Sequence, residues 1–285
     1  MQMQIQPRRQ GVPIVLFATL AVVFQASTTL AQPGQKGPKK ARVLPVDSRP
    51  NGLSYGEWSA RHWQWLYSLP VDAHPLFDTA DVSAGPSGPV WFLGGTFEAA
   101  DQGGGAMLGE ATRDVTIPAN KKLFFPLLDV QCDNVGGGDD DEAGLRGCAE
   151  FFADLIIPET LYLEVDGIAA TNLEDFRVQS PLFEIGPLPE NNALGVEAGI
   201  TSPSVSDGYF VMLPPFSVGE HTIHFSGLLD GLDVEEVGIS FELDITYNLT
   251  VVPPGRYVAA IVPEPGALLV IAGAIAGVGL IRRSR

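Results

Sequence analysis

The sequence has little of what most site chemistry requires. It contains two cysteines, four histidines and 17 basic residues against 34 acidic ones, with a formal net charge of −17 at pH 7. A surface of that sign repels nucleic acid and anionic lipid and attracts divalent cations. The composition therefore excludes a nucleic-acid partner. Because several of the few arginines lie near the two ends of the chain, the body between them is more acidic still.

Motifs for nucleophilic and phosphate chemistry are also missing. No serine lies in a Gly-x-Ser-x-Gly elbow, and Gly103-Gly104-Gly105 lacks the lysine and helix of a phosphate loop. His221 and His224 are three positions apart in a predicted strand, so they face opposite sides and form no metal pair. The sequence does not decide whether two carboxylates are paired for glycoside hydrolysis, because such residues lie close in space and need not lie close in the sequence. The sequence assigns no catalytic residue and favours a non-enzymatic protein.

No apolar run reaches the roughly 20 residues of an ordinary membrane-spanning helix, but two shorter runs lie near the ends. Two arginines precede the run 12–24, and the small-residue site Thr29-Leu30-Ala31 follows it. These are the three parts of a secretory signal peptide, so we expect residues 1–31 to be one, cleaved after Ala31. The Gly/Pro-rich residues 32–50 are expected to be a flexible linker.

The segment 259–285 has three parts in order. Pro263, Glu264 and Pro265 precede the uncharged apolar run 267–281, and a basic tetrapeptide ends the chain. As a helix the run would be about 22 Å long, which is marginal for a membrane span. Arginines after such a helix favour a cytoplasmic C-terminus. We therefore expect a short transmembrane helix, with the preceding body on the outer side of the inner membrane.

This tripartite order resembles the PEP-CTERM sorting signal of exported bacterial proteins. The resemblance covers about a tenth of the chain. It implies recognition by an exosortase-type processing enzyme, removal of the tail, and delivery to the cell surface or to an exopolysaccharide matrix. Pro263, Glu264 and Pro265 are the only positions to which it assigns a role, as the sorting motif.

Between the two ends, the pattern of residues 51–258 predicts one β-rich domain. The clearest pattern is 239–251, where apolar and polar residues alternate without error. Successive side chains of a strand point to opposite faces, so this segment predicts one buried and one solvated face. Shorter runs separated by Gly and Pro lie at 90–97, 122–128, 161–165, 209–213 and 221–225. Their spacing predicts a mainly β fold, a β-sandwich or jelly-roll.

Two short helices are predicted among the strands. Ser54 and Glu57 have the spacing of a capping box, which begins a helix that continues to about Leu69. The second is expected over about 142–156, with Asp141 as its N-cap.

The first helix carries a surplus of aromatic residues. Trp58, His62 and Trp65 share one face at helical spacing, and Trp63 points elsewhere. Such a stripe either docks a helix onto a sheet or, where rings stay exposed, stacks on sugars. Core packing is the more ordinary interpretation. Trp58, Trp63 and Trp65 are the possible ligand contacts.

The two cysteines, Cys132 and Cys148, are expected to pair in a disulfide if the protein is exported, with free thiols or zinc as the alternatives. The loop between them is acidic, and its carboxylates offer oxygen ligands to calcium. The order of residues matches no EF-hand, and a solvated loop is the competing interpretation. The calcium candidates are Asp133, Asp139, Asp140 and Asp141. No other metal or cofactor is predicted.

The body also resembles a group of secreted bacterial proteins without an assigned activity. The likeness is carried by Gly56–Trp65, Ser87–Leu93, Pro118–Pro126, Asp207–Tyr209 and Gly219–Phe225, and it implies no chemistry. We expect an exported surface or matrix protein with an adhesive or carbohydrate-contact role, and polysaccharide as a possible partner. The alternative is an extracellular hydrolase acting on polysaccharide or another polymer. A pocket with two carboxylates, or with a His–carboxylate pair of shifted pKa, would favour the enzyme.

Overall fold

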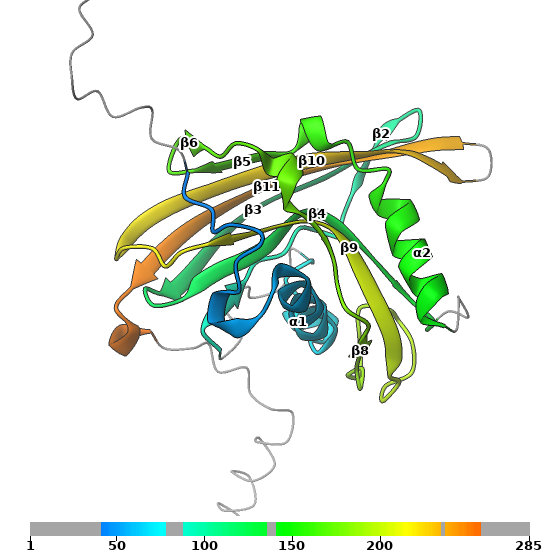
Figure 1. Ribbon diagram of the computed structural model, residues 1–285, viewed down its shortest axis with the longest axis horizontal. Helices are drawn as coiled ribbons and strands as arrows, with labels where there is room; N and C mark the ends of the chain where they lie inside the picture. Colours follow the sequence, from blue (N-terminus) through cyan, green and yellow to red (C-terminus); the bar gives the residue numbers. More distant parts are fainter. Residues whose placement is uncertain (1–40, 78–87, 136–140, 235–236, 258–285) are drawn as a thin grey trace, which may run out of the picture. The chain divides into compact units, whose positions relative to one another are not determined.

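The computed structural model describes residues 41–77, 88–135, 141–234 and 237–257. Two β-sheets are stacked in these residues, and α1 (Tyr55–Tyr67) lies below them in Figure 1. The predicted mainly β fold with two helices is confirmed. The predicted signal peptide and the apolar C-terminal run lie outside the described residues. Within the described ranges, no helix is both long enough and apolar enough to cross a bilayer.

The central sheet has five strands in the order β1-β4-β9-β7, with β8 also pairing to β9. β4 and β9 are antiparallel, and β1 joins β4 in a parallel pair. The strands are β1 (Val90–Phe92), β4 (Lys122–Asp133), β7 (Arg177–Gln179), β8 (Phe183–Ile185) and β9 (Ser202–Leu213).

The second sheet has six strands in the order β2-β3-β11-β10-β5-β6. β10 and β11 form a long antiparallel hairpin, and β11 pairs with β3 in parallel. The strands are β2 (Ala100–Gly103), β3 (Ala106–Pro118), β5 (Tyr162–Val165), β6 (Ile168–Ala169), β10 (Gly219–Val234) and β11 (Val237–Val252). Leu243, Ile245 and Tyr247 are buried while their neighbours are more exposed, so the alternation read from 239–251 is confirmed.

The core between the two sheets consists of aliphatic and aromatic side chains from both. Phe125 of β4 and Phe225 of β10 meet across it with ring centroids 4.9 Å apart. On the outer face of the central sheet, α1 adds a second apolar layer, in which Tyr55 packs edge-on against Phe124. The central sheet is therefore covered on both faces, which explains why the sequence of β4 is almost continuously apolar.

Both predicted helices form with the predicted caps. At the start of α1 the Ser54 Oγ accepts from the Glu57 backbone amide, and the Glu57 carboxylate accepts from the Ser54 amide. The Asp141 side chain caps α2 (Glu142–Ala153) by accepting from the Gly144 amide at 2.8 Å. Short 3₁₀ turns occur at Pro50–Gly52, Val71–Ala73, Pro158–Thr160, Leu173–Phe176 and Pro254–Arg256.

The part of the expected linker that the structure describes packs on the domain. The Ala41 amide donates to the Ala169 carbonyl at 3.3 Å, and the Leu44 amide donates to the Met212 carbonyl at 2.8 Å. Val43, Leu44 and Val46 pack against the apolar clusters. Residues 41–50 are therefore ordered as part of the domain rather than as a flexible linker, because backbone pairing with two strands holds them.

Candidate functional site

The aromatic residues of α1 are used mainly for packing. Trp58 and Trp63 are 7% and 6% exposed, and Trp65 is half-buried. The indole Nε1 of Trp58 donates to the Pro50 carbonyl at 2.9 Å, so that its polar atom is satisfied inside the domain. Of the three predicted ligand contacts, Trp65 keeps the most accessible ring.

A shallow groove of about 430 Å³ runs beside this ring. Trp58, Trp65 and Phe92 supply its aromatic surface, and Arg61 and Gln64 supply polar groups. Arg61 is exposed, whereas the Gln64 amide donates to the Glu184 carbonyl at 3.0 Å. The lining residues are Leu53, Trp58, Arg61, Gln64, Trp65, Gly88, Pro89, Val90 and Phe92. An aromatic floor with donors at its edge suits a sugar, which has apolar ring faces and a hydroxylated rim.

On its other side α1 meets a row of polar side chains from the central sheet. Trp63 Nε1 donates to Asp129 Oδ2 at 2.8 Å, and the Tyr67 hydroxyl donates to Gln131 Oε1 at 2.9 Å. The rings of Trp63 and Tyr67 stack with centroids 5.4 Å apart. This pairing fixes the helix over β4 and holds one carboxyl oxygen of Asp129 in place.

A β-bulge in β4 sets the direction of Asp129. The register with β9 shifts between Pro126 and Leu128, so Leu127 is an extra residue. Leu127 and Leu128 both belong to the core between the sheets, after which Asp129 lies on the side of α1. A bulge re-aims the side chains that follow it. If the same sequence continued from Pro126 as a regular strand without a bulge, the alternation would turn Asp129 into the apolar core between the sheets.

Asp129 lines a half-enclosed pocket of about 210 Å³ where α1, β4 and β11 meet. The walls are mostly apolar, and the groups of the lining that can hydrogen-bond through their side chains are His62, Trp63, Thr96 and Asp129. Phe97 is 46% exposed. The described residues that line it are His62, Trp63, Leu66, Leu76, Gly95, Thr96, Phe97, Pro126, Leu128, Asp129, Phe241 and Leu243.

Burial changes the titration of the pocket's ionisable groups. It raises the pKa of Asp129 to about 8, against a smaller opposing effect of the hydrogen bond from Trp63. Burial lowers the pKa of His62 to about 4, with nearby His74 acting in the same direction. Burial lowers the pKa of His74 to about 4 as well. At neutral pH the pocket therefore holds an uncharged imidazole and a carboxyl group that is largely protonated.

The hydrogen bonds of His62 define its tautomer. Its Nε2 lies 2.9 Å from the Leu93 carbonyl oxygen, which can only accept, so Nε2 carries the proton. Nδ1 is then a bare acceptor, and it has no hydrogen-bond partner among the described residues. A buried acceptor without a partner is unfavourable by about 1–3 kcal/mol.

The pocket wall formed by residues 94–97 is held by two buried side chains. Arg113 Nη1 donates to the Gly95 carbonyl at 2.7 Å and to the Gly94 carbonyl at 3.3 Å. The Tyr247 hydroxyl donates to the same Gly94 carbonyl at 2.8 Å. Arg113 and Tyr247 are paired across β3 and β11, so the second sheet fixes this wall in place.

Gly208 lies opposite Asp129 in β9 and makes the bulge possible. Its φ is +152°, and a Cβ there would lie 2.5 Å from the Asp129 Cα and 2.7 Å from the Leu128 carbonyl oxygen. We expect Gly208→Ala to lower the free energy of unfolding by about 2 kcal/mol, because the backbone beside Asp129 must move. Gly238→Ala, where nothing lies within 4 Å, is the control. Equal urea midpoints for the two variants would contradict the proposed close approach.

Cys132 of β4 and Cys148 of α2 form a disulfide with Cα atoms 6.2 Å apart. It links the helix to the central sheet and is expected to contribute about 3 kcal/mol by restricting the unfolded chain.

The calcium candidates do not converge in the described residues. Asp133 accepts from the Val135 amide and from Gln131, and Asp141 is used as the helix cap. Asp139 and Asp140 lie outside the described residues. Within the described ranges, no group of three or more His, Cys, Asp or Glu side chains is arranged to hold a metal ion.

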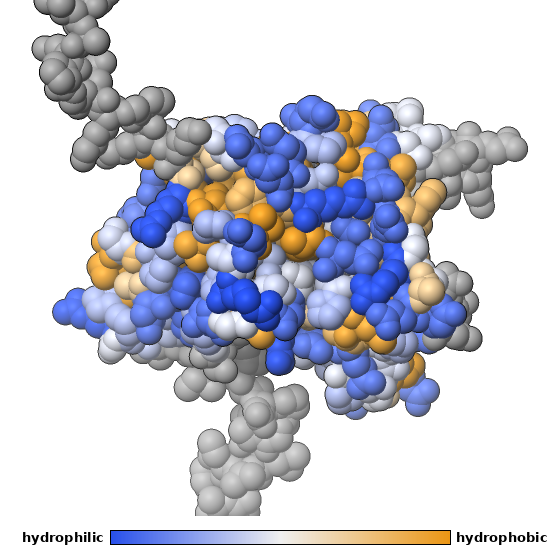
Figure 2. All heavy atoms as spheres, viewed as in Figure 1, coloured by the Kyte–Doolittle hydropathy of each residue, from blue (hydrophilic) through white to orange (hydrophobic). Residues whose placement is uncertain are grey.

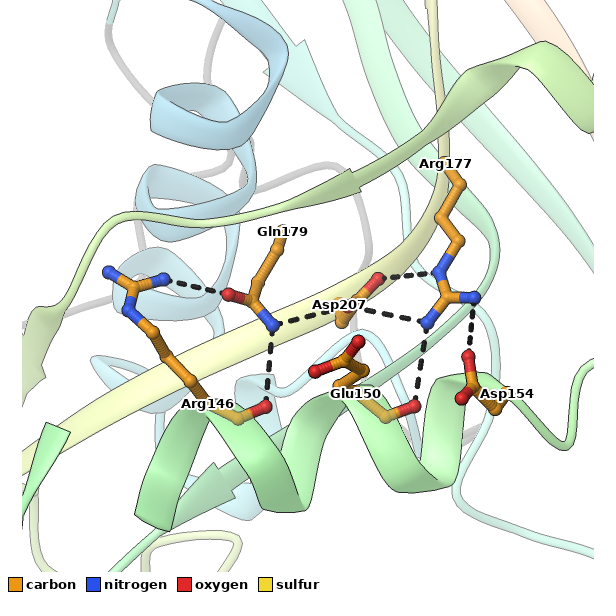
Figure 3. A network of polar contacts seen from close by, with 6 residues as sticks. All are labelled: Arg146, Glu150, Asp154, Arg177, Gln179 and Asp207. Atoms are coloured by element: carbon orange, nitrogen blue, oxygen red, sulfur yellow. Dashed lines mark hydrogen bonds and ion pairs between the residues drawn. The ribbon is translucent and has the colours of Figure 1, made fainter. Parts of the chain in front are cut away.

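A second polar cluster fastens α2 to β7 and β9 (Figure 3). Arg177 Nε donates to Asp207 Oδ1 at 3.0 Å, and its Nη1 donates to Asp154 Oδ1 at 2.7 Å. Gln179 bridges Asp207 to the Arg146 carbonyl, at 3.3 Å to each. Partial burial disfavours the guanidinium charge, but the bonds to Asp207 and Asp154 outweigh it and raise the pKa of Arg177. Since these side chains are paired with one another, the role of the cluster is structural.

The two histidines of β10 lie on opposite sides of the strand, as the alternation predicts. His224 Nε2 contacts Asp244 Oδ1 at 2.9 Å. His221 Nδ1 contacts Asp166 Oδ2 at 2.7 Å, and its Nε2 lies 3.3 Å from the Ser217 hydroxyl. A Ser–His–Asp chain is thus formed at the surface, which the sequence did not indicate because Asp166 is distant in the chain.

Comparison with protein-family models, with curated proteins and with solved structures finds no match for this chain.

Proposed function

We propose that the protein is exported to the cell surface or the extracellular matrix and binds carbohydrate there without altering it. The observation that supports this most is the groove beside α1, where Trp65, Trp58 and Phe92 lie next to Arg61 and Gln64. Export, the exosortase-type enzyme and the temporary membrane anchor rest on the segments 1–31 and 259–285.

The surface agrees with a matrix-facing role. The face drawn in Figure 2 is largely hydrophilic, with smaller apolar patches between the hydrophilic residues. In a chain of net charge −17, the exposed Arg61 is a local cation within the groove. A guanidinium binds carboxylates and hydroxyls through several donors. The proposed ligand is therefore a neutral or uronate-containing polysaccharide rather than a nucleic acid or an anionic lipid surface.

We expect Trp65→Ala to weaken carbohydrate binding at least tenfold, because stacking of a sugar ring on the indole is lost. The mature protein is first screened on a glycan array, and the strongest glycan is then titrated calorimetrically. Phe151→Ala, which removes a ring that is 61% exposed on α2, serves as the matched control and is expected to bind normally. Absence of any array signal, or equal loss in both variants, would contradict the groove as the binding site.

The pocket of Asp129 fits a polymer hydrolase only in part. His62 and Asp129 are a His–carboxylate pair with shifted pKa values in one pocket, which favours an enzyme. However, among the described residues Asp129 is the one carboxylate in the lining, and glycoside hydrolysis generally needs two. The lining hydroxyl, of Thr96, donates to the Leu76 carbonyl at 3.3 Å. The mostly apolar walls are also poorly suited to a polysaccharide.

An extracellular hydrolase remains the second candidate because of the Ser217–His221–Asp166 chain. One contact opposes it: His221 Nε2 is also 3.0 Å from the Ser217 carbonyl oxygen. That oxygen can only accept, so an Nε2–H directed to it cannot take the serine proton. The wild type and Ser217→Ala are compared on a panel of chromogenic esters. Esterase activity that is lost in Ser217→Ala would favour the hydrolase over the carbohydrate-binding protein.

A further inference from the structure

The pocket of Asp129 is separate from the carbohydrate groove and has its own chemistry. The two share α1, but no residue lines both. Protein interiors are normally packed without voids larger than a water molecule. A half-enclosed space of about 210 Å³ is well above that size. A cavity of about 150 Å³ in another protein accommodates benzene, so this one has room for a ring with a short substituent.

The polar group that the pocket offers to a ligand is the carboxyl group of Asp129. Asp129 Oδ2 already accepts from Trp63, and as a carboxylate the group has further acceptor capacity. His62 lines the same pocket but is 1% exposed, and its Nδ1 is buried without a partner among the described residues. When Asp129 is ionised, a carboxylate in an apolar space favours a ligand that supplies charged hydrogen-bond donors.

The rings around these acceptors add a preference for positive charge. Trp63, Phe97 and Phe241 all line the pocket. The faces of aromatic rings attract cations, most strongly where water is excluded. A carboxyl group and three aromatic residues together form the kind of surroundings in which an ammonium group is stabilised.

We propose that this pocket binds a small organic ammonium, with an apolar body of about the size of benzylamine and a protonated amine that donates to Asp129. The apolar body replaces water against Leu66, Leu128 and Leu243. The ammonium pairs with the carboxylate of Asp129, so that the charge buried on the protein gains a partner. The structure thereby assigns to the domain a second ligand site of a different class from the groove.

The first test titrates the mature protein with three probes of similar shape, namely benzylamine, benzyl alcohol and benzoate, at pH 8. The Trp63 indole N–H resonance is the readout, because Nε1 donates directly to Asp129. We expect benzylamine to bind at least tenfold more tightly than benzyl alcohol, and benzoate not to bind. Similar affinities for all three, or no shift with any of them, would overturn the proposal.

Asp129→Asn and Asp114→Asn separate the pocket from general charge effects. The first substitution keeps the shape of the side chain and an acceptor for Trp63, whereas Asp114 is exposed on β3 and contacts Asn248. Asp129→Asn is expected to reduce the preference for benzylamine over benzyl alcohol to less than twofold, and Asp114→Asn to leave it intact. Loss of the preference in both variants would show attraction by the net charge and refute a site at Asp129.

The pH dependence of benzylamine binding tests the pairing with Asp129 independently. If the ammonium pairs with ionised Asp129, the apparent affinity falls roughly 50-fold between pH 8 and pH 6, in proportion to the ionised fraction of a group with a pKa of about 8. Among the neighbours of Asp129, His62 and Tyr67 on α1 stay neutral over this range. Asp133 is the other acidic residue of β4 near Tyr67. Phe241 and Leu243, which line the pocket from β11, have no ionisable side chain. An affinity independent of pH would exclude the carboxylate pairing.

Discussion

Replacing Arg177 by methionine is expected to lower the free energy of unfolding by about 3 kcal/mol. The Asp207 side chain, 6% exposed, would lose its charge partner while staying buried beneath α2. Removing one member of a buried ion pair costs more than the pair itself contributes, because the remaining charge is not solvated. Gln179 still donates to Asp207, which keeps the expected loss at the lower end of the usual range. Urea unfolding at pH 7 measures the change.

Two further variants identify the cause of this loss. Arg49→Met removes an exposed ion pair with Glu57, in which Arg49 is 60% exposed, and is expected to cost under about 1 kcal/mol. The double variant Arg177→Met/Asp207→Asn removes both charges of the buried pair and is expected to recover most of the stability. If the double variant is as unstable as Arg177→Met alone, loss of packing rather than an unpaired charge explains the effect.

Asp129→Asn is expected to stabilise the protein at pH 8 by roughly 3 kcal/mol and to have almost no effect at pH 4. The pKa of Asp129 is raised in the folded state to about 8, above its unfolded value near 4. The folded state therefore retains a proton that the unfolded state releases, and stability is lost as pH rises between these two values. The expected gain is smaller than the full pKa difference implies, because the pocket is partly open to solvent. Asparagine removes this dependence.

The measurement is the difference in unfolding free energy between Asp129→Asn and wild type at several pH values. Taking the difference cancels the other carboxylates, whose contributions are common to both proteins. Asp114→Asn, on the exposed face of β3, is expected to give a small and nearly constant difference. A destabilised Asp129→Asn at pH 8 would mean that Asp129 is ionised and paired in the folded state, and would contradict the raised pKa.

The parts of the fold that local patterns determine could be predicted from the sequence. Ser54 and Glu57 define the start of α1 because both halves of the capping box are within one turn of chain. The alternation along β11 is unambiguous because one of its faces is buried and the other solvated. Strand ends were predicted less well: β4 extends to Asp133 and β9 begins at Ser202. In both, pairing between strands continues through polar residues that the hydrophobic pattern does not include.

The pocket could not be predicted, because the position of Asp129 depends on a change of register. Within the apolar run 122–128 the alternation cannot be read, so the face on which Asp129 emerges is undefined by the sequence. Pro126 was a usable signal, since proline inside a central strand is confined largely to bulges. The partnership of Asp129 with Trp63 and His62 also depends on where α1 lies, and this is decided by tertiary packing.

The pairing of β11 also bears on how the domain responds to tension. β11 is flanked by β3 and β10 along nearly its whole length, and its C-terminal end leads to Tyr257, whose ring packs edge-on against Trp91. The hydrogen bonds of the antiparallel β10–β11 ladder run perpendicular to the strands, and those of the parallel β3–β11 ladder are slanted. A pull on the chain beyond Tyr257, along the strand, would load both ladders in shear, so that many bonds must break together. The short edge strand β6 is paired with β5 at only two positions, so it would resist the same pull with far fewer bonds.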